Sequence, residues 1–329
     1  MGLLALAIVV LLGRKGELSG TAASFSHIEA PWVVLGVGAE ALSMMSFALM
    51  AGRLLGEARS PLKARSLLVI ALASNALTNS LPAGPAFGAA YSFRRYQERS
   101  VPDIVAGWAV VAVTVLAAAG LAVLASVGVM AALGQGTALD LVGVTAGTLV
   151  VAGLLMAVVR EPQIVAPLVA GAVRLSRALF RRPRVDGHEV ARRLRERVSV
   201  VTPSWIGLWI ALGWALANWA LDLACLVCAF GAVDAPVPWR GLLLAYGAAQ
   251  LAANLPITPG GLGVVEGSLT IGLVAYGGAE ASSVAAVLVY RVISFWALLI
   301  VGWSCVGGLA VVGRRRRARE AAELEEVTA

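Results

Sequence analysis

The stretch Asn254-Leu255-Pro256-Ile257-Thr258-Pro259-Gly260-Gly261 interrupts an apolar segment, and Asn79-Ser80-Leu81-Pro82-Ala83-Gly84-Pro85 interrupts an earlier one. Both follow the spacing L-P-x-x-P after an asparagine. Proline and glycine end a helix and open a turn. The apolar halves around the later break, 241–255 and 264–276, are each too short to cross a hydrocarbon core of about 30 Å. Each interrupted segment is therefore predicted to enter the membrane and return as a re-entrant hairpin.

The composition around these breaks is that of a membrane protein. The chain is 59% hydrophobic and 14% charged, with a mean hydropathy of +0.85, whereas soluble globular proteins are about half apolar and a quarter charged. Further apolar segments lie at 32–51, 104–133, 139–159, 204–233 and 283–312, and a shorter run lies at 2–12. We expect an all-α, polytopic integral membrane protein with about six full spans and two hairpins.

The positive charge of the chain, formally +7, sets its orientation. Basic residues concentrate in four links: Arg53 to Arg65, Arg94 to Arg99, Arg160 to Thr202, and Arg314 to Arg319. Such links face the cytoplasm by the positive-inside rule, which favours a multi-pass protein of the bacterial inner membrane with a cytoplasmic C-terminus. Residues 66–93 then start and end on the cytoplasmic side, whereas links 233–239 and 277–282 lie outside.

The two breaks thus predict an inverted repeat within a single transmembrane domain, 1–313, followed by a charged cytoplasmic tail, 314–329. Units at about 32–133 and 203–312 each consist of span, hairpin and span in opposite orientation, joined through a cytoplasmic basic link, 160–202. Interrupted helices in such repeats point to the substrate site, and the buried start of each second hairpin helix attracts phosphate or carboxylate. The alternative is that each break is an ordinary loop between two short spans.

Ionisable groups deep in spans are costly and usually functional, and the chain places Glu40, Asp222, Glu266 and Arg291 there. Glu266 either caps a buried helix start, pairs with Arg291 or a cationic headgroup, or binds a coupling proton. Arg291 and Arg94 suit a lipid phosphate, although Arg94 is equally explained as a cytoplasmic anchor. Asp222 has the alternative of a hydrogen bond across helices. The expected substrate-binding residues are Arg94, Asn79, Pro82, Asp222, Asn254, Pro256, Gly260, Gly261, Gly263, Glu266 and Arg291.

Other classes of site have little support. Cys225 and Cys228 have a redox or metal spacing without further ligands nearby in sequence, and the phosphate-binding motif G-x-x-x-x-G-K-[ST] does not occur. We therefore expect no metal, no cofactor, no catalytic residue and no nucleic-acid partner. Residues 189–201 are either an amphipathic helix on the lipid surface or a solvated loop. The spacing of Gly143 and Gly147 is compatible with a homodimer.

The break at 254–266, with its sequence P-G-G-x-G-x-x-E from Pro259 to Glu266, resembles the membrane region of the lysylphosphatidylglycerol synthase family. Tyr290 to Trp296 is similar to the arginine-led aromatic helix of that family, and Asn79 to Arg94 is similar to its first hairpin. The resemblance covers nearly the whole chain. The first hairpin departs from the family in being more apolar at 83–87, which leaves the headgroup preference open.

The resemblance implies a function. Full synthases carry a soluble domain that transfers lysine from aminoacyl-tRNA to phosphatidylglycerol, while their membrane part is assigned to moving the lipid between leaflets. Only the membrane part is expected here. The leading hypothesis is therefore a flippase-like translocase, not an enzyme and not driven by ATP itself, for an anionic, amino-modified or polyprenyl-linked membrane lipid. The alternatives are an intramembrane transferase using Asp222 with Glu266, and a secondary transporter of a small solute.

Overall fold

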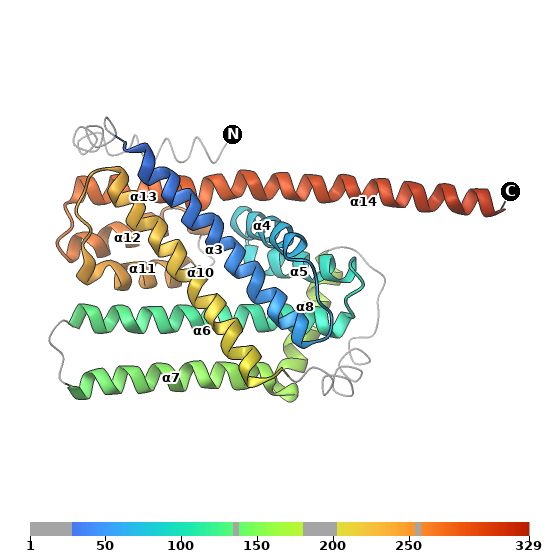
Figure 1. Ribbon diagram of the computed structural model, residues 1–329, viewed down its shortest axis with the longest axis horizontal. Coiled ribbons are helices and arrows are strands. Elements are labelled where there is room, and N and C mark those ends of the chain that lie inside the picture. The colour runs from blue at the N-terminus through green and yellow to red at the C-terminus, as the bar shows by residue number, and fades with distance from the viewer. Residues whose placement is uncertain (1–27, 134–137, 180–202, 254–257, 329) are drawn as a thin grey trace.

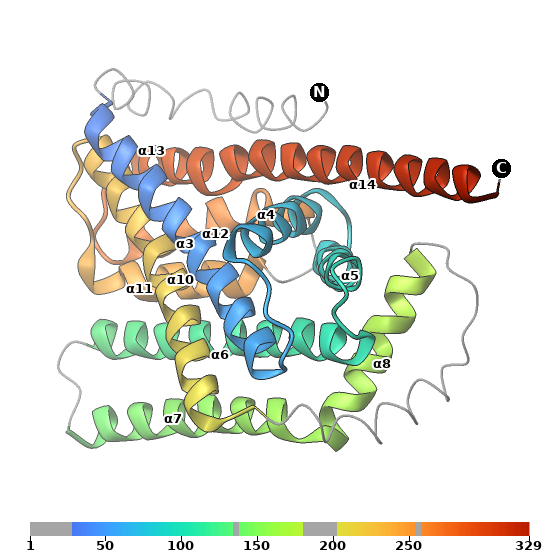
Figure 2. The same cartoon turned by 45° about the vertical axis from the view of Figure 1, so that its right-hand side comes forward.

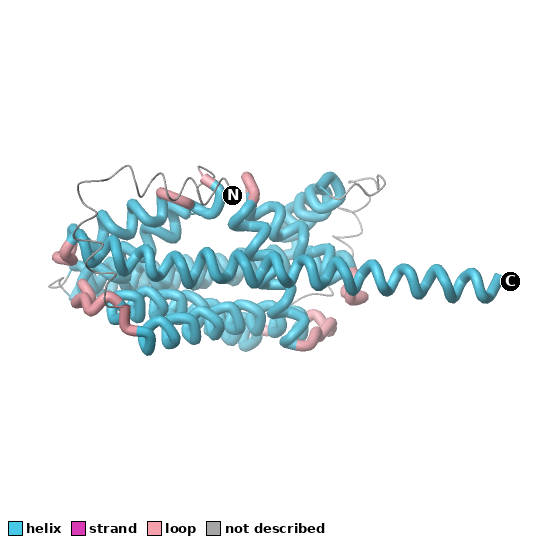
Figure 3. The backbone as a smooth tube through the Cα atoms, turned by 90° about the horizontal axis from the view of Figure 1, so that it is seen from above, coloured by secondary structure: helices cyan, strands magenta, loops and turns pink. Residues whose placement is uncertain are grey.

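The computed structural model describes residues 28–133, 138–179, 203–253 and 258–328, and the regular structure in these residues is entirely helical (Figures 1 and 3). The helices are α3 (Ala30–Glu57), α4 (Ala64–Ser80), α5 (Gly84–Gln97), α6 (Asp103–Leu133), α7 (Ala138–Arg160), α8 (Pro162–Leu179), α10 (Trp205–Ala232), α11 (Trp239–Ala253), η2 (Pro259–Gly261), α12 (Val264–Ala275), α13 (Glu280–Arg291), η3 (Val292–Ala297) and α14 (Leu298–Thr328).

Five helices among the described residues are long and apolar enough to cross a bilayer: Ala30–Glu57, Asp103–Ala132, Val142–Arg160, Trp205–Ala232 and Glu280–Arg314. This confirms the predicted all-α, polytopic membrane protein. The short apolar run at 2–12, which the sequence suggested as a further span, lies outside the described residues. At 15 and 12 residues, α11 and α12 are each too short to cross alone.

The first long helices of the two expected units, α3 and α10, pack antiparallel along their whole length (Figures 1 and 2). At one end the amide of Glu29 donates to the carbonyl of Ala232 at 3.0 Å. At the other end the amide of Ser204 donates to the carboxylate of Glu57 at 2.9 Å. Because α4 follows the end of α3 and α11 follows the end of α10, the two hairpins start from opposite ends of the bundle.

Each hairpin packs against the last long helix of the other unit, α4 against α14 and α11 against α6. Glycine allows both close contacts. A Cβ at Gly302 would lie 2.4 Å from the carbonyl oxygen of Leu72, and one at Gly128 would lie 2.8 Å from the carbonyl carbon of Leu243. Two units related by a two-fold axis would exchange contacts in this way. Their inversion relative to a bilayer stays a prediction, because helix packing alone does not give the orientation in a membrane.

The described residues that border the basic links 53–65 and 160–202 lie at one end of the bundle. Glu57 and Ser204 meet there, and the guanidinium of Arg160 lies 4.4 Å from the ring centroid of Trp205. The long continuous helix of α13, η3 and α14 also runs toward this end, where the C-terminus lies (Figure 1). That this end faces the cytoplasm remains a prediction.

The basic link contains a helix that the sequence analysis did not predict. Helix α8 packs on α5 and α6 through buried residues of one face, namely Val165, Ala166, Val169 and Ala170. The helix could not be recognised from its sequence, because Pro167 and the arginines that follow it are typical of a loop. The expected surface helix at 189–201 lies outside the described residues. The expected tail at 314–329 continues α14 to Thr328.

The apolar core has two parts with polar residues between them. One part surrounds α3, α5, α6 and α8 and includes Ala215 of α10, and the other surrounds α11 to α13 and includes Cys225 of α10. Between these two residues, α10 carries the buried Asn218 and Asp222. Buried polar side chains inside a membrane helix need partners, so this polar layer between the two parts of the core is a candidate functional region.

Candidate functional site

The first hairpin turns at Leu81, Pro82 and Ala83, where Ala83 has φ 55°. Gly84 is required at the start of α5, because a Cβ there would lie 1.7 Å from the carbonyl oxygen of Thr78. Just before the turn, the side-chain amide of Asn79 donates a hydrogen bond to Oδ1 of Asn75 at 2.9 Å. Pro82 is exposed at its apex. The first tip therefore presents the polar end of α4 beside a turn that glycine keeps compact.

The second tip consists of η2 and the residues up to α12, where Gly260, Gly261 and Gly263 all have positive φ. The hydroxyl of Thr258 donates to the carbonyl of Leu262 at 2.9 Å and closes the turn. The tip packs on the end of α4, since a Cβ added to Gly260 would lie 2.8 Å from the carbonyl oxygen of Asn79. The two breaks in the sequence therefore meet in the fold.

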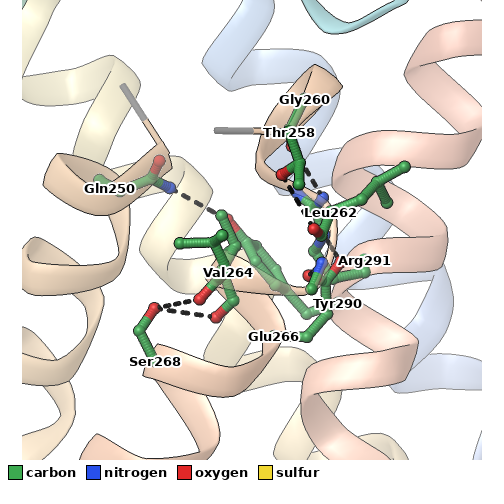
Figure 4. A network of polar contacts seen from close by, with 11 residues as sticks. Gln250, Thr258, Gly260, Leu262, Val264, Glu266, Ser268, Tyr290 and Arg291 are labelled. Carbon is green, nitrogen blue, oxygen red and sulfur yellow. Dashed lines mark hydrogen bonds and ion pairs between the residues drawn. The ribbon is translucent and has the colours of Figure 1, made fainter. Parts of the chain in front are cut away.

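A partly buried ion pair holds the second tip in place (Figure 4). Arg291 Nε donates to Glu266 Oε1 at 2.6 Å, and Arg291 also donates to the carbonyl of Gly260 at 3.1 Å. The other oxygen of Glu266 accepts from the amide of Gly263 at 2.7 Å and so caps the start of α12. Glu266 thus fills two of the roles that the sequence left open, those of helix cap and partner of Arg291.

The chain around Arg291 is shaped to present this side chain. Arg291 is 8% exposed, and its guanidinium lies 4.3 Å from the ring centroid of Phe295. Residues Val292–Ala297 form a π-helix directly after it. Such π-helical turns are rare and occur frequently at functional sites, because the wider turn changes which side chains a helix points at its neighbours. Here that turn follows the arginine that binds the hairpin tip.

A second polar network surrounds Asp222 beside the hairpin. One carboxylate oxygen of Asp222 accepts hydrogen bonds from the hydroxyl of Tyr246, from the hydroxyl of Tyr290 at 2.9 Å, and from the amide of Gln250 at 3.1 Å. Gln250 also contacts the hydroxyl of Tyr290 at 3.3 Å (Figure 4). Tyr246 and Gln250 belong to α11, and Tyr290 directly precedes Arg291. The two networks are therefore joined through consecutive residues of α13.

Arg94 lies away from the tips. It is ten residues beyond Gly84 along α5, or about 15 Å at 1.5 Å per residue. Its Nε donates to Glu98 at 3.1 Å, and Arg95 donates to the same carboxylate at 2.6 Å. Burial acts to raise the pKa of Glu98, but the charges and hydrogen bonds of Arg95 and Arg94 hold it below its ordinary value. The surroundings fit the anchor that the sequence offered as the alternative.

The structure thus brings part of the expected set together. The residues at the joined tips are Asn79, Pro82, Gly260, Gly261, Gly263, Glu266 and Arg291. Asp222 belongs to the adjoining network, and Asn254 and Pro256 lie outside the described residues. Sequence reasoning missed Tyr246 and Gln250, and it named Tyr290 and Phe295 only as part of the aromatic motif at 290–296. Tyr246 and Gln250 are four residues apart and share one helix face, a weak signal that only the position of Asp222 makes meaningful.

Comparison with known proteins agrees with this architecture. The sequence model of the family described as "Lysylphosphatidylglycerol synthase TM region" matches residues 1–302. A UPF0104 membrane protein of Methanothermobacter thermautotrophicus is 41% identical over 98 residues, which are 30% of this chain and 26% of that protein. The aligned stretch thus spans about a quarter of that relative. The predicted resemblance is confirmed: the chain belongs to the family of the lysylphosphatidylglycerol synthase TM region and is a multi-pass membrane protein related to lipid handling.

Proposed function

We propose that the protein is a lipid translocase, which moves an anionic, amino-modified or polyprenyl-linked lipid between the leaflets of the bacterial inner membrane. The observation that carries this proposal is the meeting of the two hairpin tips, Gly260 against Asn79, with the partly buried pair of Arg291 and Glu266 beside it. Membrane lipids are then its partners, and its basic end and C-terminus face the cytoplasm.

The joined tips meet the physical demands of headgroup passage. Backbone that is not helical cannot face lipid, so both turns belong in protein or beside a wet cavity. A phosphate crossing the hydrocarbon needs a cation, and an unpaired buried cation is costly. Glu266 neutralises Arg291 when no lipid is present. A lipid phosphate, which accepts bidentate hydrogen bonds from arginine, can replace that carboxylate without leaving the guanidinium unpaired.

The alternative of an intramembrane transferase has less support. It requires Asp222 and Glu266 to act as one carboxylate pair. Each carboxylate instead has its own partners, Tyr246, Tyr290 and Gln250 for Asp222, and Arg291 with the amide of Gly263 for Glu266. We therefore place lipid movement first.

The test is leaflet exchange in vesicles. The full chain is reconstituted in phosphatidylcholine and phosphatidylglycerol, and exchange of labelled phosphatidylglycerol is followed by chemical quenching of the outer leaflet. We expect exchange faster than in empty vesicles, and a reduction of about tenfold in Arg291→Gln, the effect of losing about 1.4 kcal/mol of stabilisation. Arg53→Gln is the matched control, because Arg53 also pairs with a glutamate but lies away from the tips, with its side chain 37% exposed.

Two results would contradict the proposal. One is exchange no faster than in empty vesicles for any headgroup tried. The other is an Arg291→Gln protein that is monodisperse, with a melting temperature close to that of the wild type, and exchanges lipid at the wild-type rate.

A further inference from the structure

A second carboxyl faces Asp222 from α3. The antiparallel register of α3 and α10 is fixed by Ser43 and Asn218, since the amide of Asn218 donates to Ser43 Oγ at 2.7 Å and Ser43 Oγ donates to the carbonyl of Asn218 at 3.0 Å. One turn further along both helices, Glu40 and Asp222 are electrostatic neighbours. Both are buried, at 4% and 9% exposure. Two carboxyl groups thus lie side by side in the middle part of two membrane spans.

The two carboxyls differ in their hydrogen bonds. Asp222 accepts from three donors, whereas Glu40 Oε2 is fully buried and has no hydrogen-bond partner. Among the described residues, no arginine or lysine forms an ion pair with either group. The other titratable side chains that face the pair are Cys225 of α10, Tyr246 of α11 and Tyr290 of α13. None of these supplies a positive charge.

Two adjacent carboxylates in a site of low dielectric constant cannot both be ionised without a cation. Asp222 already accepts three hydrogen bonds, whereas the buried Glu40 Oε2 accepts none, so we place the shared proton on Glu40. A sodium ion fits less well, because it needs oxygen atoms with free lone pairs, and one oxygen of Asp222 already faces two hydroxyl protons and an amide. A proton on Glu40 Oε2 would give this buried oxygen, which has no hydrogen-bond partner, a group that can donate a hydrogen bond.

We propose that Glu40 and Asp222 form a proton-binding site that couples lipid movement to a proton gradient. This inference rests on the proposed function. The proton enters from one aqueous side, binds to the pair, and leaves to the other side, so that charge and mass balance without any further reactant. The ligand of the site is the proton, and the site is separate from the joined hairpin tips.

The connection to the tips runs through α11 and α13. Asp222 holds Tyr246 and Gln250 of the second hairpin, and it holds Tyr290, the neighbour of Arg291. Loss of the proton from Glu40 places a second negative charge beside Asp222, and the hydrogen-bond donors of α11 and α13 are the groups positioned to offset it. Linkage is reciprocal. Movement of the hairpin must therefore change the proton affinity of the pair.

The first arm of the test does not depend on lipid movement. The full chain in lipid films is examined by infrared spectroscopy for the carbonyl band of a protonated carboxyl near neutral pH. We expect this band in the wild type, its loss in Glu40→Gln, and its retention in Cys228→Ala, a control on the same part of α10. A wild-type protein without the band, or a Glu40→Gln protein that is folded and keeps the whole band, overturns the proposal.

The second arm measures lipid exchange in vesicles with and without an imposed pH gradient. We expect the gradient to change the wild-type rate about fivefold, the lower end of common coupling factors, and to leave the rate of Glu40→Gln unaffected. A wild-type rate that ignores the pH gradient, or responds to a sodium gradient at constant pH instead, overturns the coupling. If the wild type moves no lipid at all, the proposed function fails, and the infrared arm still decides whether the pair holds a proton.

Discussion

Removing Glu266 should destabilise the protein far more than removing its partner Arg291. In Glu266→Ala the guanidinium of Arg291, a residue only 8% exposed, still contacts the carbonyl of Gly260 and the ring of Phe295 but loses its counter-charge. Breaking a buried pair in this way costs about 3–5 kcal/mol, and loss of the cap on the amide of Gly263 adds about 1 kcal/mol.

Arg291→Met has a different outcome. The side chain of Glu266 is 23% exposed and keeps the amide of Gly263 at the start of α12, where a negative charge is favoured. We expect a cost of about 1–2 kcal/mol, close to that of ordinary substitutions. In the double variant the unpaired guanidinium is gone, so its stability should exceed that of Glu266→Ala alone.

The assay is thermal unfolding in detergent, followed by tryptophan fluorescence, in a double-mutant cycle. At about 2–4 °C per kcal/mol, Glu266→Ala should melt roughly 8–24 °C below the wild type, and Arg291→Met roughly 2–8 °C below it. Arg53→Met, which breaks a more exposed pair, should change little. The reasoning is refuted if Arg291→Met is as unstable as Glu266→Ala, or if the two changes are additive.

Three further predictions concern single side chains. Gly260→Ala should lower both the stability and the rate of lipid exchange, because a Cβ would lie 2.3 Å from the ring of Phe295. Gly263→Ala, whose Cβ would meet no atom within 4 Å, should show only the strain of its positive φ, about 1–2 kcal/mol, and melting temperatures will distinguish the two variants. Tyr290→Phe removes one donor from Asp222 and should destabilise by about 1.5–3 kcal/mol in the same assay. The pKa of Glu98 is lowered in the folded protein, so its ionised carboxylate stabilises the fold fully above its ordinary pKa of about 4.5, and this stabilisation is lost as the pH falls through the lowered pKa. Glu98→Gln should therefore be less stable than the wild type at neutral pH and equally stable in strong acid, which melting temperatures at several pH values will test.

The hairpins could be predicted from sequence because their signals are local. Proline and glycine at 81–85 and 259–261 mark the turns, whereas the membrane orientation that the charge of the links predicts stays a prediction. The partner of Glu266 could only be named as one of several, since Arg291 lies 25 residues away and the choice depends on how α12 and α13 pack. The sequence close to Glu266 carries no information on how these two helices pack.

The network around Asp222 could not be predicted for the same reason. Its donors come from α11 and α13, and each tyrosine by itself reads as an ordinary aromatic residue of a membrane helix. Glu40 has no charged residue near it in sequence, so its neighbour could not be predicted either. The antiparallel contact of α3 with α10 supplies the missing neighbour.

The exchange of hairpins between the units also constrains how the chain is made. Helix α4 packs on α14, and the indole of Trp303 donates to Ser80 at 3.0 Å, across 223 residues of sequence. A ribosome releases α4 long before α14 exists, so the first hairpin must be inserted without its final wall. Lipid, or the insertion machinery, has to cover that face until the last span arrives. Truncation before α14 should therefore leave a first unit that is recognised by membrane quality control.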